Sequence, residues 1–336
     1  MIKVALIGAG KMGISHLAIL GAHPDVQIVG VVDTSSIVTD ALKKYSGFRC
    51  FSDHKSLLSF TRPDAVFVAV PTKFHYSIVH DLLLRDIHVF VEKPFCLEVN
   101  DGFDLVSIAK QKNLVNQVGY HNKFIGTFEE AKRLIDNNYL GQILHFSGDM
   151  NGPVVLKKKQ DNWRSKPEEG GGCLMDYAAH IIDLINYIVG PIKNIKGAML
   201  KSFYSGTVDD GVFTLLETEN NVSGVLNVNW SDETYRKMST SITIIGTEGK
   251  IIVDATEMKV YFKKSTIPDG YTQGWNIKHI NSFAENVDFY LRGEEYSAQV
   301  DYFIKAVEGL VPNNKNTFAT AWITDKVIDK IKKYSN

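Results

Sequence analysis

The chain has 336 residues, and at about 150 residues per domain this length favours two domains. Lysine and arginine number 37 and aspartate and glutamate 38, so the net charge of −1 excludes a general electrostatic attraction to nucleic acid. Hydrophobic residues make up 44% and charged residues 22% of the chain, which excludes a disordered protein and is typical of a globular one.

The sequence shows no sign of a membrane span or of export. No apolar run approaches the roughly 20 residues that a membrane helix needs. Residues 1–8 contain a short apolar stretch without a signal-peptide cleavage pattern. Cys50, Cys96 and Cys173 stand far apart without CxxC spacing, which disfavours a disulfide framework and a zinc site. We therefore expect a cytoplasmic protein with no metal, membrane or nucleic-acid partner.

The first third of the chain alternates short apolar runs with helical stretches. Strands are predicted at residues 3–8, 27–33, 65–70, 88–91 and 114–120, and helices at 13–22, 38–46, 54–60, 74–85 and 100–112. Nearly continuous Val, Ile, Phe and Ala are typical of strands buried on both faces of a parallel sheet. The alternation predicts βαβ units and hence an α/β fold with an N-terminal Rossmann doubly wound parallel sheet.

The pattern changes after Tyr120. A helix at 126–138, a strand at 142–150, a polar loop from Asn151 to Glu169 and a helix at 173–189 are followed by a run of strands. The predicted strands are 193–204, 210–217, 222–230, 239–246, 249–255 and 258–263, and the predicted closing helices are 281–291, 298–309 and 317–333. Apolar and polar residues alternate along two of these strands, which predicts a large open, mostly antiparallel sheet with one polar face.

These elements predict two domains of different architecture. We expect residues 1–122 to form the Rossmann domain and residues 123–336 to form an α+β domain. The last helices are able to pack back on the first domain.

A glycine loop joins the first predicted strand to the first predicted helix. In the run Gly8-Ala9-Gly10-Lys11-Met12-Gly13, the first glycine allows a tight turn, the second allows a pyrophosphate to approach and the third allows helix–strand packing. Asp33 ends the second strand, 20 residues after Gly13, where a carboxylate binds a ribose 2′-hydroxyl and repels a 2′-phosphate. None of the next three residues, Thr34, Ser35 and Ser36, is an arginine, so the sequence favours NAD over NADP as the cofactor.

Proton-handling residues follow in two places. Lys93 comes directly after the strand at 88–91, at the sheet edge where ligands of α/β folds bind. Asp176 and His180 are four residues apart on the helix predicted after Gly170-Gly171-Gly172, and so share one face. An imidazole suits the exchange of a hydroxyl proton. The alternative interpretations are a surface lysine and an ordinary exposed Asp–His pair.

Four separated motifs together resemble the Gfo/Idh/MocA oxidoreductases, the relatives of glucose–fructose oxidoreductase and inositol dehydrogenase. They are the glycine loop, Val70-Pro71-Thr72 with His75, Glu92-Lys93-Pro94, and Gly170 to His180. The resemblance implies hydride transfer between a nicotinamide and a secondary hydroxyl of a sugar, polyol or nucleotide sugar. It implies Lys93, Asp176 and His180 as the catalytic residues.

The resemblance also implies the remaining contacts. It places Gly8, Gly10, Lys11, Met12, Gly13, Asp33, Val70, Pro71, Thr72, His75, Glu92 and Lys93 at the cofactor. It places Tyr120, His121 and Asn122 near the nicotinamide and the substrate. Thr72 stands where many members have Asn, Asp86-Ile87 where many have Gly-Lys, and Ala178 where many have Gly. These departures leave the subfamily open. The resemblance also implies that the first domain binds NAD, and that the second binds the substrate and associates into a homodimer or homotetramer.

The loop from Asn151 to Glu169 is predicted to form a wall of the substrate site. Trp163, Arg164, Tyr177 and the catalytic side chains are the expected substrate contacts. The basic run Lys157-Lys158-Lys159, with Arg164, suits an anionic group on the substrate, although a solvated surface run is equally compatible.

Two other functions stay open at this point. A non-catalytic regulator that binds NAD or sugar could share the fold, since fold does not fix function. A reductase of a diol, an imine or a tetrapyrrole could use the same residues.

Overall fold

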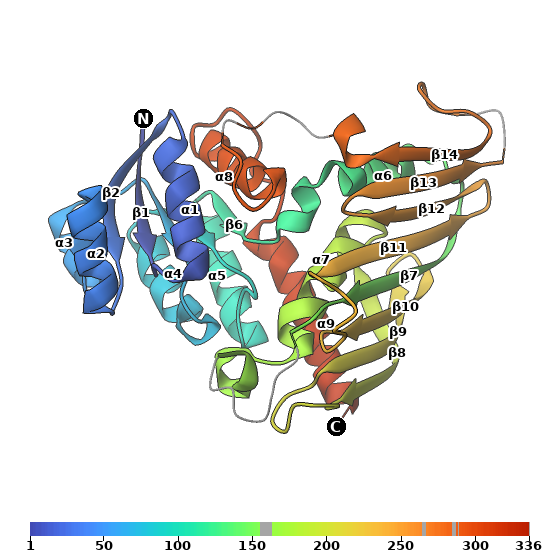
Figure 1. Cartoon of the computed structure of the whole chain (residues 1–336), viewed down its shortest axis with the longest axis horizontal. Coiled ribbons are helices and arrows are strands. Elements are labelled where there is room, and N and C mark those ends of the chain that lie inside the picture. Colours follow the sequence, from blue (N-terminus) through green and yellow to red (C-terminus); the bar gives the residue numbers. More distant parts are fainter. Residues whose placement is uncertain (155–162, 264–266, 284–286, 288, 336) are drawn as a thin grey trace. The chain divides into compact units, whose positions relative to one another are not determined.

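The computed structural model describes residues 1–154, 163–263, 267–283, 287 and 289–335. The chain divides into two compact units (Figure 1). The first contains Met1–His121 and Asn286–Trp322, and the second contains Asn122–Glu285 and Ile323–Asn336.

The first unit contains a six-stranded sheet in the order β3-β2-β1-β4-β5-β6, and every neighbouring pair is parallel. Its strands are β1 (Ile2–Ile7), β2 (Val26–Val32), β3 (Cys50–Phe51), β4 (Ala65–Val68), β5 (His88–Val91) and β6 (Asn116–Val118). Its helices are α1 (Lys11–Ala22), α2 (Ser36–Ser46), α3 (His54–Phe60), α4 (His75–Leu84), α5 (Val99–Gln111) and α8 (Glu294–Val307). The predicted Rossmann sheet is confirmed.

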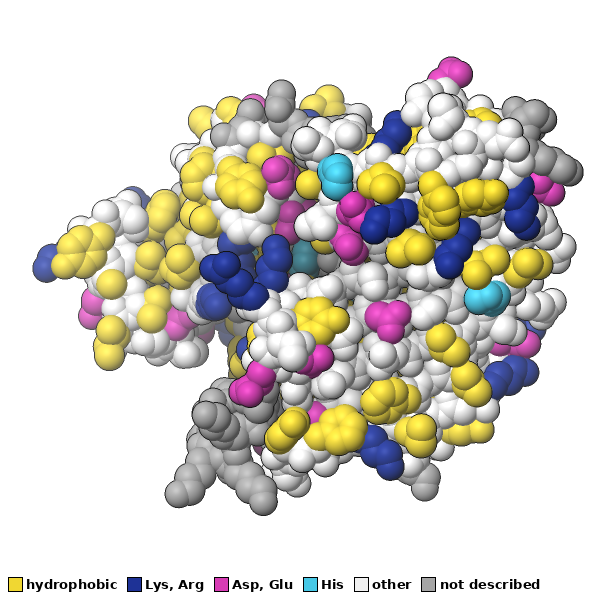
Figure 2. Space-filling view, turned by 45° about the vertical axis from the view of Figure 1, so that its right-hand side comes forward, with side chains coloured by type: hydrophobic (Ala, Val, Ile, Leu, Met, Phe, Trp, Pro, Cys, Tyr) yellow, Lys and Arg dark blue, Asp and Glu magenta, His cyan; other side chains and the backbone are white. Residues whose placement is uncertain are grey.

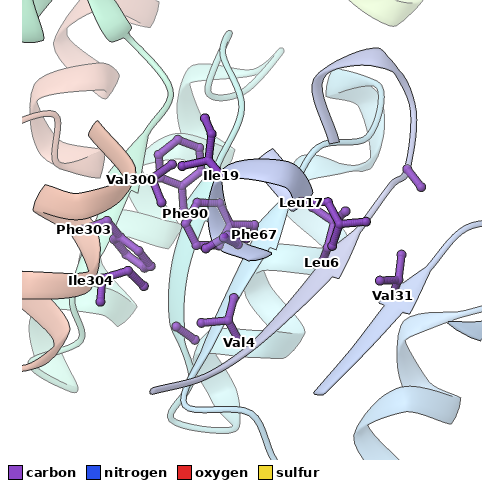
Figure 3. Packing of buried hydrophobic residues seen from close by; sticks show 13 residues of the cluster. Val4, Leu6, Leu17, Ile19, Val31, Phe67, Phe90, Val300, Phe303 and Ile304 are labelled. Carbon is purple, nitrogen blue, oxygen red and sulfur yellow. The ribbon is translucent and has the colours of Figure 1, made fainter. Parts of the chain in front are cut away.

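The core of this unit combines the central strands with a helix from near the C-terminus (Figure 3). Phe67 of β4 and Phe90 of β5 stack at 4.6 Å between ring centroids. Phe303 of α8 meets both rings edge-on, at 5.3 and 5.9 Å. Burial of such rings stabilises the unit by about 1.5–3 kcal/mol for each side chain, so α8 is an integral part of the Rossmann unit.

Three features of the chain differ from the prediction. β3 was not predicted, because a strand of two residues carries no periodicity. The helix predicted at 281–291 is absent from the described residues there: Ile280–Ser282 form only a 3₁₀ turn. α8 begins at Glu294, earlier than the predicted 298, directly after a turn in which Arg292 (φ 65°) and Gly293 (φ 124°) reverse the chain.

The second unit contains an eight-stranded sheet in the order β14-β13-β12-β11-β7-β10-β9-β8. Its strands are β7 (Ile143–Asn151), β8 (Ile192–Lys201), β9 (Gly211–Thr218), β10 (Ser223–Asn229), β11 (Ser239–Gly246), β12 (Gly249–Asp254), β13 (Glu257–Phe262) and β14 (Gly274–His279). Only the pair β7–β10 is parallel among the neighbouring strands of this described sheet, so the predicted mostly antiparallel sheet is confirmed.

Helices cover one face of this sheet. α6 (Gly126–Asp136) packs on β12 and β13, and α7 (Ala179–Ile188) packs on β7. Leu226, Val228 and Trp230 are buried, as the alternation predicted. α9 (Phe318–Ser335) begins in the first unit and continues in the second.

The edge strand β14 was not predicted. Trp275 and Ile277 remain 54% and 57% exposed, and the other residues of the strand are half-buried or exposed. An edge strand without a buried face leaves no hydrophobic alternation in the sequence.

Within the described residues, no helix is both long and apolar enough to cross a membrane. Over the same residues, no group of three or more His, Cys, Asp or Glu side chains is arranged to hold a metal ion.

Candidate active site

The glycine loop lies between β1 and α1, and two of its glycines are required by close packing. A Cβ on Gly8 (φ 93°) would lie 2.5 Å from the Ala69 carbonyl oxygen. A Cβ on Gly13 would lie 1.9 Å from the Gly8 carbonyl oxygen. Gly10 differs, because nothing lies within 4 Å of a Cβ built there. The loop is therefore tight at both ends and open in the middle.

The open middle of the loop fits a dinucleotide pyrophosphate. Gly10 is the N-cap of α1 and offers no capping side chain, so the first N–H groups of the helix are available to an anion. Lys11 and Met12 form the first turn of α1, exposed and half-buried respectively. Asp33 accepts hydrogen bonds from the Ala9 N–H (2.7 Å, Oδ2) and the Ser35 N–H (2.8 Å, Oδ1), which fixes the loop beside the end of β2.

The predicted cofactor segment after β4 is held by a buried histidine. Thr72 is buried in a 3₁₀ turn, and His75 begins α4. The His75 ring nitrogens lie 3.0 Å from the Val70 carbonyl oxygen and 3.0 and 3.1 Å from those of Pro94 and Phe95. His75 thus connects the Val70–Pro71 segment to the turn after β5 through polar contacts of its ring.

Glu92 is buried at the end of β5 beside a histidine that was not predicted. His16 of α1 donates from Nε2 to Glu92 Oε1 at 2.6 Å, and the Lys93 N–H donates to Oε2 at 3.3 Å. Burial raises the pKa of Glu92, but the bond from His16 and the Lys93 charge outweigh it, so the net pKa is below its ordinary value. The carboxylate is therefore ionised and fixes the turn that carries Lys93.

Lys93 and the segment after β6 lie at the carboxyl edge of this sheet. Lys93 is half-buried and precedes a cis peptide bond to Pro94. Tyr120 and His121 are buried, and the Tyr120 carbonyl oxygen accepts a 2.6 Å hydrogen bond from the Asn316 amide. The residues predicted near the nicotinamide in this unit therefore share the sheet edge at which α/β folds bind ligands.

The helix that carries Asp176 and His180 starts irregularly. Leu174–Ala178 form a π-helical turn, and regular α7 follows from Ala179, so the prediction of one regular helix at 173–189 is wrong for its first turn. Asp176 and His180 are 3% and 4% exposed. The alternative of an ordinary exposed pair is therefore wrong. Short π-helical turns occur frequently at functional sites.

Arg164 binds the Asp176 carboxylate. Its Nε donates to Oδ2 at 2.8 Å, and its guanidinium lies 4.7 Å from the centre of the Trp163 ring. Gly171 makes room for this arrangement, since a Cβ there would lie 2.5 Å from the Arg164 carbonyl oxygen. Trp163 and Arg164, the two loop residues predicted to contact substrate, therefore lie near the start of the helix that carries Asp176.

Within the predicted loop from Asn151 to Glu169, the structure describes residues 151–154 and 163–169, and Asn151 itself ends β7. Trp163–Ser165 and Pro167–Glu169 form 3₁₀ turns, and Pro153 pairs with Ser231. Lys157, Lys158 and Lys159 lie outside the described residues.

Asp209 anchors the start of the π-helical turn, and the adjacent Asp210 binds residues that follow β8 and β10. Asp209 Oδ2 accepts from the Leu174 N–H at 2.6 Å, and its carbonyl oxygen accepts from the Cys173 N–H at 2.9 Å. Asp210 accepts from the Trp230 indole and three other donors. In the sequence, Asp209 and Asp210 are visible only as an Asp-Asp pair at the start of the strand predicted at 210–217. Nothing there identified them as site residues.

Tyr177 is buried between Asp176 and the sheet. Its ring meets Trp230 edge-on at 6.0 Å, and a Cβ on Gly152 would lie 2.5 Å from its hydroxyl oxygen. Burial, together with the neighbouring Asp176 charge, raises the pKa of Tyr177 above its ordinary value, so the hydroxyl stays protonated.

A buried ion pair secures the next turns of α7. Lys123 Nζ lies 2.8 Å from Asp183 Oδ1, with side chains only 4% and 1% exposed. Lys123 also lies 5.5 Å from the centre of the Tyr187 ring. Asp176, His180 and Asp183, at successive turns on one side of this helix, are therefore all buried, and Tyr187 one turn further is half-buried.

The candidate residues are divided between the units. Lys93, Tyr120 and His121 belong to the first unit, and Asn122, Trp163, Arg164, Asp176, Tyr177 and His180 belong to the second. Asn122 is buried, 2% exposed.

Comparisons with known proteins match both units. A model of the oxidoreductase family with an NAD-binding Rossmann fold matches residues 2–120, and a model of the GFO/IDH/MocA C-terminal domain matches residues 128–252. An uncharacterized oxidoreductase of Schizosaccharomyces pombe is 29% identical over 186 residues, which are 54% of this chain and 50% of that protein. The match thus spans about half the length of that relative.

Two further relatives match over more of their length. D-xylose dehydrogenase of Paenarthrobacter nicotinovorans is 21% identical over 308 residues, 83% of this chain and 79% of the relative. The structure of a levoglucosan dehydrogenase in complex with NADH and levoglucosan superposes with a TM-score of 0.86 and 22% identity, covering 99% of this chain and 96% of that one. At this identity the structural match shows the fold.

The two family models cover the glycine loop, the Glu92-Lys93-Pro94 turn and the buried Asp176–His180 helix. The resemblance seen in the sequence is thereby confirmed. The chain belongs to the Gfo/Idh/MocA family of oxidoreductases, whose first domain is an NAD-binding Rossmann fold.

Proposed function

We propose that the protein is an NAD-dependent oxidoreductase that transfers a hydride between nicotinamide and a secondary hydroxyl or ketone of a sugar, polyol or nucleotide sugar. The observation that carries this proposal is the burial of Asp176 and His180 on one helix, with Arg164 on the carboxylate. A regulator that only binds its ligand has no need of buried proton-exchanging groups at these motif positions.

Each residue has a distinct role in the oxidation of an alcohol. His180 takes the hydroxyl proton, Lys93 donates a hydrogen bond to the same oxygen, and Asp176 orients the imidazole and the substrate. Bound NAD supplies the hydride acceptor. The O–H proton goes to His180, the carbon–hydrogen bond breaks with its electron pair leaving as hydride, and the carbon–oxygen single bond becomes a carbonyl double bond. General acid–base assistance of this kind contributes about 10²–10⁴ in rate.

The proposed substrate contacts are aromatic and polar side chains. Tyr120, Trp163 and Tyr177 offer ring faces to the C–H groups of a sugar, and His121 and Asn122 offer polar groups to its hydroxyls. The names of D-xylose dehydrogenase and levoglucosan dehydrogenase support this substrate class. Arg164 is suited to an anionic group such as a phosphate or a carboxylate, although in this structure it binds Asp176.

A substrate panel tests this proposal. The purified protein is incubated with NAD and a set of free aldoses, polyols, uronates and nucleotide sugars, and NADH is followed by its absorbance. Turnover of at least one member is expected. Turnover of neutral sugars alone would contradict the proposal that the substrate carries an anionic group. Turnover only of diols, or in the reverse direction of imines or tetrapyrroles, would overturn the sugar assignment.

The cofactor preference is a separate prediction. Asp33 is fixed by two backbone N–H groups at the end of β2, so its carboxylate cannot easily withdraw from a 2′-phosphate. NADH is therefore expected to bind more tightly than NADPH, with the difference decreasing in Asp33→Ser. Fluorescence titration with both cofactors measures this. Tighter binding of NADPH by the wild-type protein would contradict the assignment.

We also propose that the protein acts in the cytoplasm as a homodimer or homotetramer. The uncovered face of the eight-stranded sheet carries a cross-strand row in which exposed Leu215 and Val225 are direct partners. Ser147, Thr243, Ile252 and Lys259 continue this row to exposed Ile277. The view in Figure 2 shows hydrophobic side chains interspersed with polar and charged ones. A broad half-apolar face of this kind suits association of two copies. Sedimentation equilibrium should give a mass of two or four chains, and a monomer at micromolar concentration would contradict the proposal.

A further inference from the structure

A ring stack joins the segment after β6 to the first turn of α8. The His121 imidazole and the Tyr296 ring lie 4.6 Å apart between centroids, with an interplanar angle of 21°. His121 is 6% exposed, and Tyr296 is half-buried. Both residues belong to the first unit. Tyr296 carries no sequence motif, so only the folded chain identifies it.

The charges near the stack favour a neutral imidazole. Burial lowers the pKa of His121 to about 4, and the positive charges of Lys93 and Arg292 act in the same direction. The negative charge of Glu92 acts in the opposite direction but does not outweigh the burial.

The tyrosine that covers the imidazole stays uncharged as well. Burial raises the pKa of Tyr296 to about 12, so its phenol keeps its proton. The guanidinium of Arg292 lies 5.5 Å from the centre of the same ring.

We propose that Tyr296 is a positioning residue of the active site, whose ring covers His121 and holds it as an uncharged hydrogen-bonding group at the carboxyl edge of the six-stranded sheet. The inference rests on the proposed function, since His121 affects catalysis only if nicotinamide and substrate bind at this edge. A protonated His121 would add a second cation beside Lys93, where oxidised nicotinamide also carries a positive charge. The aromatic cover prevents this protonation in the neutral pH range.

The charge state of His121 is measured directly by NMR on the full chain without substrate. Histidine side chains are isotope-labelled, and the signal of His121 among the ten histidines is assigned as the one lost in His121→Asn. In the wild type this signal should not titrate between pH 5 and 8. In Tyr296→Leu its midpoint should rise by at least about one unit, and in Tyr296→Phe, which keeps the ring, it should not move.

A pH profile gives the functional readout. If exposure moves the His121 midpoint to about 6, the neutral fraction at pH 5.5 falls about fourfold. The kcat/KM of Tyr296→Leu should therefore decrease about fourfold more than that of the wild type between pH 7.5 and 5.5, while Tyr296→Phe follows the wild type.

Several results would overturn the proposal. They are wild-type titration of His121 near 6.5, an unchanged midpoint in Tyr296→Leu, and a Tyr296→Phe variant that behaves like Tyr296→Leu. If Tyr296→Leu does not fold, the titrations of His121 in the wild type and in Tyr296→Phe still test the proposal. The NMR result needs no turnover, so it is independent of whether the panel of sugars identifies a substrate.

Discussion

Replacing His180 or Lys93 by alanine is expected to lower turnover by about 10²–10⁴-fold, the range associated with losing a general acid–base group. His180 is 4% exposed and lies one turn after Asp176, and Lys93 stands at the carboxyl end of β5. Each variant removes a group that is proposed to touch the reacting oxygen and leaves the glycine loop intact. The expected loss is therefore in kcat, with NADH affinity nearly unchanged.

Matched variants separate this effect from general damage. His145 is an exposed histidine of the same unit as His180, and Lys110 is an exposed lysine of the same unit as Lys93. His145→Ala and Lys110→Ala should keep wild-type turnover. Steady-state kinetics on the substrate found in the panel, with NADH titration by fluorescence, provide both readouts. Wild-type turnover in His180→Ala or in Lys93→Ala would reject the role assigned to that residue.

The second large effect is on stability. Lys123→Met should reduce the free energy of unfolding by about 3–5 kcal/mol, because it leaves the buried Asp183 carboxylate without its ion-pair partner. The exposed pair Lys333–Asp329 has a similar distance, 2.7 Å against 2.8 Å, but the Lys333 side chain is 75% exposed. Lys333→Met should therefore cost less than about 1 kcal/mol. Calorimetric unfolding of both variants measures the difference.

The loss in Lys123→Met should depend on pH. Burial already raises the pKa of Asp183, while Lys123 acts to lower it, so removing Lys123 raises the pKa further. An acid with a raised pKa in the folded state binds its proton more tightly there, so the variant is least destabilised at low pH and loses stability as pH rises. The double variant Lys123→Met/Asp183→Leu should recover most of the loss, because no charge remains unpaired. Equal decreases in the free energy of unfolding for Lys123→Met and Lys333→Met would contradict a stabilising role for the buried Lys123–Asp183 pair.

The elements that the sequence predicted correctly are those whose signal is local. The strands around Leu6, Phe67 and Phe90 are continuous apolar runs, and the glycine loop is recognisable from its spacing directly after the first of them. β3 and β14 were not predicted because a two-residue strand and an exposed edge strand bury too little to leave a pattern. The described residues of 281–291 form no helix, and α8 begins at Glu294, directly after the turn at Arg292 and Gly293.

The residues of the candidate site also divide into those with a local sequence signal and those without one. Lys93, Asp176 and His180 were found because their motifs lie within a few residues of a glycine run or a strand end. His16, Tyr296, Asp209 and Lys123 were not found, since each acts on a partner between 35 and 175 residues away. Contacts at such separations leave no trace in hydrophobic periodicity.

The sequence by itself determined the two-domain organisation that we expect, the Rossmann fold, the family and the residue types available for chemistry. The Rossmann fold follows from local steric limits on glycine and from the period of apolar residues, which act between close neighbours in the chain, whereas the family came from the resemblance of four short motifs. Only the tertiary structure decided the state of those residues. Burial of Glu92 beside His16, of His121 beneath Tyr296 and of Asp176 beside Arg164 arises from long-range packing, and packing sets the local dielectric and the charge partners of a side chain.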